Sequence, residues 1–318
     1  MRERWPRTTP VLQVDKDEAA LLLAPVCGDV HINALEPLSG GHSNTNIVVR
    51  LEDQSVVLRL YQRDPAQARK EAAISQLVAG RVPVPRYLHV GQREPDGQTY
   101  EVVEFVEGET LQSFAKQAHD SELATAGASV GSVLAAIHSF NFVTAGFLDG
   151  ELKITSFPGG ISNTGFLESC FRGIAGERVG RELADAVIAF AKRNEGRSEK
   201  WNNPPRLTHF DFGGTNILMR NDGTVSGVVD WEFAAAASPA PDFGNLLRAP
   251  LGQKSEFVEG VERGYRAAGG TLPGDWRELT RLADLGAWAE FMTRTNVSEQ
   301  VVEDARAVFR KTISSPAA

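Results

Sequence analysis

Two aspartates and one asparagine lie around a segment that the sequence predicts to be a hairpin. Two apolar, β-rich runs, residues 216–219 and 224–229, are joined by Asn-Asp-Gly, a turn sequence that tolerates the positive φ angles of a tight hairpin. Antiparallel pairing returns the chain to its starting edge, so Asp230 is expected close to Asn216. With Asp211 just upstream, two carboxylates and one amide would meet there. Such oxygen ligands suit Mg²⁺ rather than zinc.

The order of these residues resembles a known catalytic loop. His209-Phe210-Asp211, four further residues and then Asn216 resemble the H-x-D-x-x-x-x-N loop of kinases, and Asp230 stands where their metal-binding Asp follows a hairpin. Asp230-Trp-Glu in place of Asp-Phe-Gly is similar to the aminoglycoside phosphotransferase family of small-molecule kinases. The resemblance runs from about Glu36 to about Phe291, most of the chain.

The resemblance implies a role for each residue of the loop. Asp211 would accept or orient the proton of the attacking hydroxyl, while Asn216 and Asp230 would hold Mg²⁺ against the phosphates. His209 and Asp242 would support the loop rather than take part in the chemistry. The alternative for any one of these residues alone is that Asp, Asn and Gly are common in turns. Within the loop the chain has Phe210 and Phe-Gly-Gly-Thr where the family has a small residue and His-Pro.

The resemblance also implies a nucleotide site in the N-terminal part. A glycine-containing loop between two predicted strands would donate backbone and hydroxyl groups to phosphate. Arg59 takes the place of the strand lysine that contacts phosphate, and Glu71 is its expected ion-pair partner. The Glu104 carbonyl and the Val106 amide would bind adenine. Taken alone, each feature also suits an ordinary hairpin loop or surface ion pair. The loop residues expected to contact phosphate are Ser39, Gly40, Gly41 and Ser43.

The acceptor is expected to be a small molecule. The segment between Asp230 and Asp242 is short and contains no Ala-Pro-Glu, so a protein substrate would have no long activation loop to lie on. We name Glu232, Asp284 and Glu290 as guesses for acceptor-binding residues. For each of them, a solvated carboxylate beside a core-facing stripe is the simpler alternative.

The periodicity of the chain predicts its strands and helices, and the resemblance implies that they form an α+β, bilobal, protein-kinase-like fold. Residues 1–105 would form a nucleotide-binding lobe, with a five-stranded antiparallel sheet and one main helix after the third strand, and residues 106–318 a mostly helical catalytic and substrate-binding lobe. Residues 1–14 are expected to be a loosely held arm, and residues 194–205 a polar linker. The expected strands are 32–38, 46–51, 55–61, 87–90 and 100–105. The expected helices are 15–26, 66–79, 121–140, 165–174, 181–193, 255–268, 275–293 and 298–312.

Composition limits the partners. The 318 residues carry a net charge of −8 without a basic stripe, which argues against a nucleic-acid partner. We see neither a targeting segment nor an apolar run long enough to span a bilayer. Two distant cysteines, Cys27 and Cys170, suit a reducing compartment. We therefore expect a cytoplasmic monomer or homodimer, and the resemblance implies that it binds a nucleotide triphosphate and a small hydroxyl-bearing molecule.

The sequence hypothesis is transfer of the γ-phosphoryl group of ATP or GTP to a small-molecule hydroxyl, with Mg²⁺ as cofactor. An aminoglycoside-type antibiotic is the first expectation, and choline or ethanolamine, homoserine, a sugar or a macrolide are alternatives. An inactive nucleotide-binding module is a rival, but Asp211, Asn216 and Asp230 are all present. A metal-dependent phosphate hydrolase would need more ligands than His209 and Asp211 provide.

Overall fold

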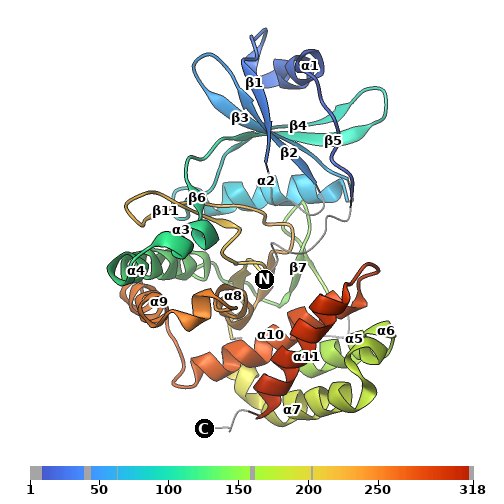
Figure 1. The fold of residues 1–318 in the computed structure, drawn as a ribbon, viewed down its shortest axis with the longest axis vertical. Coiled ribbons are helices and arrows are strands. Elements are labelled where there is room, and N and C mark those ends of the chain that lie inside the picture. Colours follow the sequence, from blue (N-terminus) through green and yellow to red (C-terminus); the bar gives the residue numbers. More distant parts are fainter. Residues whose placement is uncertain (1–8, 39–43, 63, 158–161, 202, 315–318) are drawn as a thin grey trace. The chain divides into compact units, whose positions relative to one another are not determined.

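The computed structural model describes residues 9–38, 44–62, 64–157, 162–201 and 203–314, and the chain divides into two compact units (Figure 1). Unit 1 comprises Met1–Glu122, Asp149–Lys153 and Gly214–Glu232. Unit 2 comprises Leu123–Leu148, Ile154–Gly213 and Phe233–Ala318.

A five-stranded antiparallel sheet forms the frame of unit 1 (Figure 1). Helix α2 (Ala66–Val78) follows the third strand. The expected N-terminal sheet with one main helix after its third strand is therefore confirmed, and with it the α+β class. In the order of their position in the sheet, the strands are β1 (Ala34–Pro37), β2 (Thr45–Arg50), β3 (Ser55–Leu60), β5 (Gln98–Glu104) and β4 (Tyr87–Arg93).

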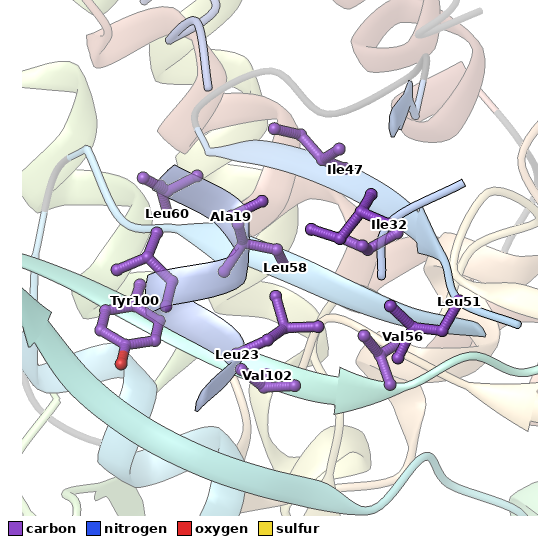
Figure 2. Close-up of a cluster of buried hydrophobic side chains, with 12 residues drawn as sticks. Ala19, Leu23, Ile32, Ile47, Leu51, Val56, Leu58, Leu60, Tyr100 and Val102 are labelled. Carbon is purple, nitrogen blue, oxygen red and sulfur yellow. The ribbon is translucent and has the colours of Figure 1, made fainter. Parts of the chain in front are cut away.

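The side chains of strand β3 alternate between an apolar face and a polar face of the sheet. Val56, Leu58 and Leu60 are buried and pack with Leu23 of helix α1 (Lys16–Cys27), as Figure 2 shows. Burying a leucine side chain contributes ~1.5–3 kcal/mol, so this alternation fixes which residues point inward. The side chain of Arg59, between Leu58 and Leu60, lies on the opposite face, because successive residues of a strand point to opposite sides.

The segment before α1 is held against the sheet. The Leu12 N–H donates to Thr45 Oγ1 at 3.0 Å, and Gln62 Nε2 donates to the Pro10 carbonyl at 2.8 Å. Leu12 and Val14 pack on the apolar cluster of Figure 2. The expectation of a loose arm was therefore wrong for residues 10–14. Residues 1–8 lie outside the described part.

The predicted hairpin belongs to a second, three-stranded sheet of unit 1. Strand β10 (Ile217–Met219) pairs with β11 (Val225–Val228) on one side and with β6 (Glu109–Thr110) on the other. Gly223 takes the positive φ of the turn, +80°, where a side chain would be strained. Thr110 caps helix α3 (Leu111–Gln117) by accepting the Ser113 N–H.

Unit 2 is mainly helical. A four-stranded sheet accompanies its helices, with the strands β8 (Ile154–Thr155), β7 (Gly146–Leu148), β12 (Ala235–Ala237) and β9 (Arg206–Thr208) in that order. The helices are α4 (Asp120–Ile137, whose first residues belong to unit 1), α5 (Asn163–Phe171), α6 (Ile174–Val179), α7 (Arg181–Lys200), α8 (Ala240–Leu246), α9 (Ser255–Ala267), α10 (Trp276–Thr293) and α11 (Glu299–Ser314).

Glycines bring α4 and α9 into close contact. A Cβ at Gly131 would lie 2.2 Å from the Val261 carbonyl oxygen, and one at Gly264 would lie 2.0 Å from the Ala128 carbonyl oxygen. Two backbones can approach this closely only where no side chain stands between them. The contact brings the end of α9 beside the end of α4, where Tyr265 and His138 form a hydrogen bond.

Two expected helix boundaries in unit 2 were wrong. The expected polar linker is largely helical, because α7 continues to Lys200. Arg197 stabilises this extension through ion pairs with Asp275 at 2.7 Å and Glu278 at 2.5 Å. The helix expected over 165–174 corresponds to α5, which already ends at Phe171, and α6, which begins after Gly173, was not predicted. Local periodicity could not reveal partners that lie far along the chain.

Candidate active site

The hairpin brings Asn216 and Asp230 to one end of the small sheet in unit 1. The Val229 N–H donates to the Asn216 carbonyl at 3.0 Å, so Asp230 follows directly after a residue bonded to Asn216. Asp230 has a φ of +69°. A non-glycine residue in this region costs about 1–3 kcal/mol and occurs where the surrounding structure enforces it.

Arg59 joins the polar face of the larger sheet to Asp230. Its Nη1 donates to Glu71 Oε2 at 2.8 Å, and its Nη2 donates to Asp230 Oδ1 at 3.0 Å. Burial is the largest single influence and acts to lower the pKa of Arg59, but Glu71, Tyr61 and Asp230 together outweigh it, and the pKa is raised well above its usual value. The structure therefore brings Asp230 to the Arg59–Glu71 ion pair that the sequence analysis expected, so that two carboxylates share one permanent positive charge.

Tyrosines and a second glutamate surround Glu71. Tyr87 donates to Glu71 Oε2 at 3.0 Å, and the Tyr61 hydroxyl lies 3.0 Å from Glu71 Oε1 and 2.6 Å from Glu101 Oε2. Sequence reasoning missed Tyr61, Tyr87 and Glu101. Tyr61 lies two residues after Arg59 and Glu101 is the register partner of Arg59, so strand alternation was the signal that could have found them.

Lys70 connects α2 to the segment after the hairpin. Its Nζ donates to the Glu232 carbonyl at 2.8 Å, and burial lowers the pKa of Lys70 to about 8. Glu232, guessed as an acceptor-binding residue, thus has its backbone fixed within unit 1.

The expected adenine-binding positions lie at the end of β5. Glu104 is the last residue of this strand, and its side chain accepts the Arg86 N–H at 3.1 Å. Val106 follows two residues later and lies against Gly227 of β11. The phosphate-loop residues Ser39, Gly40, Gly41 and Ser43 lie outside the described residues.

Asp211 belongs to unit 2, where hydrogen bonds from Asp242 and Asn245 hold the backbone of the two residues before it. The Asp242 carboxylate accepts the His209 N–H at 2.9 Å and the Phe210 N–H at 2.8 Å. The Phe210 carbonyl accepts Asn245 Nδ2 at 2.8 Å. These bonds fix Phe210 at a φ of +63°, the second strained position on the motif residues. The Asp211 N–H donates to His209 Nδ1 at 3.3 Å, which places the proton of a neutral His209 on Nε2.

His138, at the end of α4, supports Asp242. His138 Nε2 lies 3.1 Å from Asp242 Oδ2, and Nδ1 lies 2.9 Å from the Tyr265 hydroxyl of α9. Burial lowers the pKa of His138, so its ring is neutral at pH 7. Because an ionised carboxylate only accepts, Nε2–H donates to Asp242 and Nδ1 accepts from Tyr265. His138, Tyr265 and Asn245 are loop supports that the sequence analysis did not identify.

Half-buried phenylalanines stand next to Asp211. The Phe210 ring centroid lies 6.0 Å from that of Phe157 and 6.5 Å from that of Phe147, and the last two rings meet edge to face at 4.7 Å.

Two of the residues guessed to bind the acceptor, Asp284 and Glu290, lie in unit 2 and have other partners. Asp284 Oδ1 accepts Arg248 Nε at 2.9 Å and its Oδ2 accepts Trp288 Nε1 at 2.9 Å, while Glu290 pairs with Arg294 at 2.8 Å.

The residues around Asp230 fit Mg²⁺ but not a metal that needs several nitrogen or sulfur ligands. Asn216 and Asp230 offer hard oxygen donors, and the Asp230 side chain is 34% exposed. The described residues contain no group of three or more His, Cys, Asp or Glu side chains that could hold a metal. Mg²⁺ commonly takes one or two protein ligands and completes its shell with phosphate and water.

These features are those of a phosphotransferase of the kinase type. They are an antiparallel sheet that carries an Arg–Glu pair, a hairpin that ends in Asp, and a His-x-Asp loop held by hydrogen bonds. The profile described as "Phosphotransferase enzyme family" matches residues 34–282. The chain belongs to this family and is a small-molecule kinase. A search of curated proteins found no match. Among the described residues, none of the helices is both long and apolar enough to cross a membrane.

Solved structures share this fold at low identity. A ternary complex of a thermostable aminoglycoside phosphotransferase APH(4)-Ia mutant with AMP-PNP and hygromycin B is 19% identical with a TM-score of 0.67, covering 93% of this chain and 98% of that one. A GDP and kanamycin complex of APH(2")-IIia is 17% identical with a TM-score of 0.69, at 93% and 98% coverage. A candidate fructosamine-3-kinase from Haemophilus somnus is 15% identical with a TM-score of 0.61, at 93% and 97% coverage.

Proposed function

We propose that the protein transfers the γ-phosphoryl group of ATP or GTP to a hydroxyl group of a small molecule. The observation that carries this proposal is the position of Arg59, which bonds Glu71 and Asp230 at once within a chain of the phosphotransferase family. An always-charged guanidinium beside a hard-oxygen metal position suits a triphosphate.

In this proposal each residue has one task. Arg59 binds the phosphate oxygens, and Glu71 keeps the guanidinium in place. Asn216 and Asp230 would hold Mg²⁺, which neutralises charge on the transferring phosphoryl group when bound. Asp211 accepts or orients the proton of the acceptor hydroxyl. The main chain of Glu104 and Val106 would bind the base, as the family resemblance implies.

An aminoglycoside is our first acceptor class, because neighbours with the same fold are complexes with hygromycin B and kanamycin. A second class is favoured by the phenylalanines beside Asp211. Phe147, Phe157 and Phe210 would offer an apolar face, and such rings suit macrolides by contact and quaternary ammonium groups such as choline by cation–π attraction. The candidate fructosamine-3-kinase among the neighbours supports keeping a non-antibiotic acceptor as an alternative.

The test is release of ADP or GDP from purified protein with Mg²⁺ and ATP or GTP across aminoglycosides, macrolides, choline, ethanolamine, homoserine and sugars. We expect one class to stimulate turnover. In Asp211→Asn we expect kcat to fall by ~10²–10⁴-fold, while nucleotide binding measured by thermal shift survives. Turnover of this variant near the wild-type rate would contradict the role of Asp211. Failure of the wild type to bind either nucleotide would contradict the proposed function.

A further inference from the structure

Behind the Arg59–Glu71 ion pair, one tyrosine hydroxyl lies between two buried carboxyl groups. The Tyr61 oxygen is 3.0 Å from Glu71 Oε1 and 2.6 Å from Glu101 Oε2. Tyr61 is 2% exposed, and Glu71 and Glu101 are fully buried. Glu101 faces Arg59 directly across β3 and β5. The proposed function uses Arg59 and Glu71 and leaves Tyr61 and Glu101 without a task.

The number of protons restricts the states of this cluster. The Tyr61 hydroxyl carries one proton and can donate it to one carboxyl group only. When the Tyr61 proton points to one carboxyl group, the oxygen of the other lies 2.6 or 3.0 Å from the Tyr61 oxygen. Without a proton between them, this contact would be repulsive, because both oxygen atoms carry lone pairs. One of the two carboxyl groups must therefore be protonated and donate to the Tyr61 oxygen. The distance of 2.6 Å suits an O–H···O bond of that kind.

The partners of each carboxyl group show which one holds the proton. Glu71 accepts from Arg59 Nη1 at 2.8 Å and from Tyr87 at 3.0 Å, and both contacts stabilise its charged form. Glu101 has Tyr61 on one oxygen, while its Oε1 is buried without a hydrogen-bond partner among the residues that the structure describes. An orphaned oxygen is far less costly on a neutral acid than on a carboxylate. The proton therefore belongs on Glu101.

We propose that Glu101 is a neutral carboxylic acid that donates to Tyr61, which donates to the Glu71 carboxylate, and that this relay makes Glu101 and Tyr61 positioning residues for Arg59. Only its consequence for nucleotide binding rests on the proposed function. The relay directs the Tyr61 proton to Glu71 Oε1, which leaves Glu71 Oε2 for Arg59 and Tyr87. It also limits the carboxylates that share the Arg59 charge to Glu71 and Asp230.

The groups around Glu101 agree with a neutral state at pH 7. The titratable groups that act on it are Arg59 of β3, Tyr61 directly after β3, Glu71 of α2 and Tyr87 of β4. Burial and the neighbouring Glu71 carboxylate raise the pKa of Glu101 to about 9. Burial also raises the pKa values of Tyr61 and Tyr87 above that of a free tyrosine, so Glu101 is the first of these neutral acids to ionise as the pH rises.

The first experiment detects the proton without using activity. Infrared difference spectra of the full-length wild type minus Glu101→Gln at pH 7 should show the C=O band of a protonated carboxyl group, shifted in D₂O. The unfolding free energy should also fall from pH 5 to pH 9 in the wild type relative to Glu101→Gln, because the folded state holds a proton that the unfolded state has lost above its ordinary glutamate pKa. Absence of the band, or parallel stability curves, would overturn the neutral state.

The second experiment tests positioning through nucleotide affinity. The dissociation constants of Mg·ATP and Mg·GTP are measured from pH 7 to pH 9.5. Wild-type affinity should fall by about tenfold as Glu101 ionises and competes for Arg59, whereas Glu101→Gln should keep its affinity across the range, because an amide N–H can replace the acid proton. Tyr61→Phe should bind about 3–10-fold more weakly throughout, since it breaks the relay, with kcat changed less than the nucleotide KM.

The matched control is Tyr100→Phe, next to Glu101 in the sequence but on the opposite, apolar face of the sheet (Figure 2). It should leave the affinity and its pH dependence unchanged. Identical pH profiles in the wild type and Glu101→Gln, or a Glu101→Gln variant already defective at pH 7, would overturn the positioning role. If the wild type binds neither nucleotide, the proposed function and the positioning role both fail, and the infrared band alone decides the neutral state.

Discussion

Phe210 donates its backbone N–H to Asp242 Oδ1 at 2.8 Å while its φ is +63°. A phenylalanine in this region is strained by about 1–3 kcal/mol, so the carboxylate holds the chain in a conformation that it would otherwise leave. The residue held in this way immediately precedes Asp211. The buried Asp242 therefore determines where the proposed base points.

Asp242→Asn should reduce both stability and turnover. An amide keeps the shape of the carboxylate, but its NH₂ group must replace either Oδ1, which accepts the Phe210 N–H, or Oδ2, which accepts from the His209 N–H and from His138, and so faces a donor in either orientation. We expect the unfolding free energy to fall by ~2–3 kcal/mol and kcat to fall by ~10²-fold through misplacement of Asp211. Denaturant titrations and steady-state kinetics measure the two effects. Asp222→Asn, at the exposed hairpin turn, is the control.

Loss of stability without loss of kcat would show that Asp242 supports the fold alone. The reverse result, a slow enzyme of normal stability, would show that Phe210 keeps its conformation without the carboxylate.

Asp230→Asn isolates the charge of the proposed metal ligand. Asparagine tolerates the positive φ of +69° found at Asp230 better than alanine does, so the backbone should survive the change. Binding of ATP or GTP should then lose its Mg²⁺ dependence, with affinity in the presence of Mg²⁺ reduced by at least about tenfold. Isothermal titration with and without Mg²⁺ measures this. A variant with an unaltered Mg²⁺ requirement would remove Asp230 from the metal site.

The sequence predicted those parts of the molecule that depend on local pattern and motif order. The hairpin that brings Asn216 to Val229 followed from its turn residues, and the main helix after β3 followed from periodicity. The continuation of α7 to Lys200 could not be predicted from the local pattern, because it is stabilised by ion pairs of Arg197 with Asp275 and Glu278, some 80 residues away along the chain.

The supporting residues of the site were missed for the same physical reason. Tyr265 of α9 reaches His138 where glycines let α4 and α9 pack closely, and Asp242 reaches His138 from α8, 104 residues along the chain. A motif lists the residues that touch substrate, whereas the groups that orient them depend on the tertiary structure. The domain boundary at residue 105 and the roles of the acidic guesses remain predictions.

Acidification should weaken the loop support through His138. Burial lowers the pKa of His138 below its ordinary value, so the unfolded chain binds a proton at a higher pH than the folded one. Stability then falls as the pH drops below about 6.5, toward the folded pKa, and is constant above it. The variant His138→Gln, which keeps an N–H donor and does not titrate, should lack this part of the slope. Unfolding free energies between pH 5 and pH 8 measure the difference.

His119→Gln is the control for this measurement, because His119 is exposed. It should reproduce the wild-type curve. If His138→Gln also reproduces that curve, protonation of His138 does not limit stability in acid.

The phenylalanines beside Asp211 should influence the choice of acceptor rather than the nucleotide. Phe157 lies edge to face on Phe147 and against Phe210, and all three rings are half-buried. Phe157→Ala should raise KM about 5–10-fold for an acceptor with an apolar or quaternary ammonium face, the loss of one aromatic or cation–π contact, and should leave the nucleotide KM unchanged. Ile174→Ala, at an exposed site of α6, is the control. An equal rise for aminoglycosides and for apolar acceptors would mean that Phe157 shapes the loop instead of contacting the acceptor, and no rise for any acceptor would exclude these rings from the acceptor site.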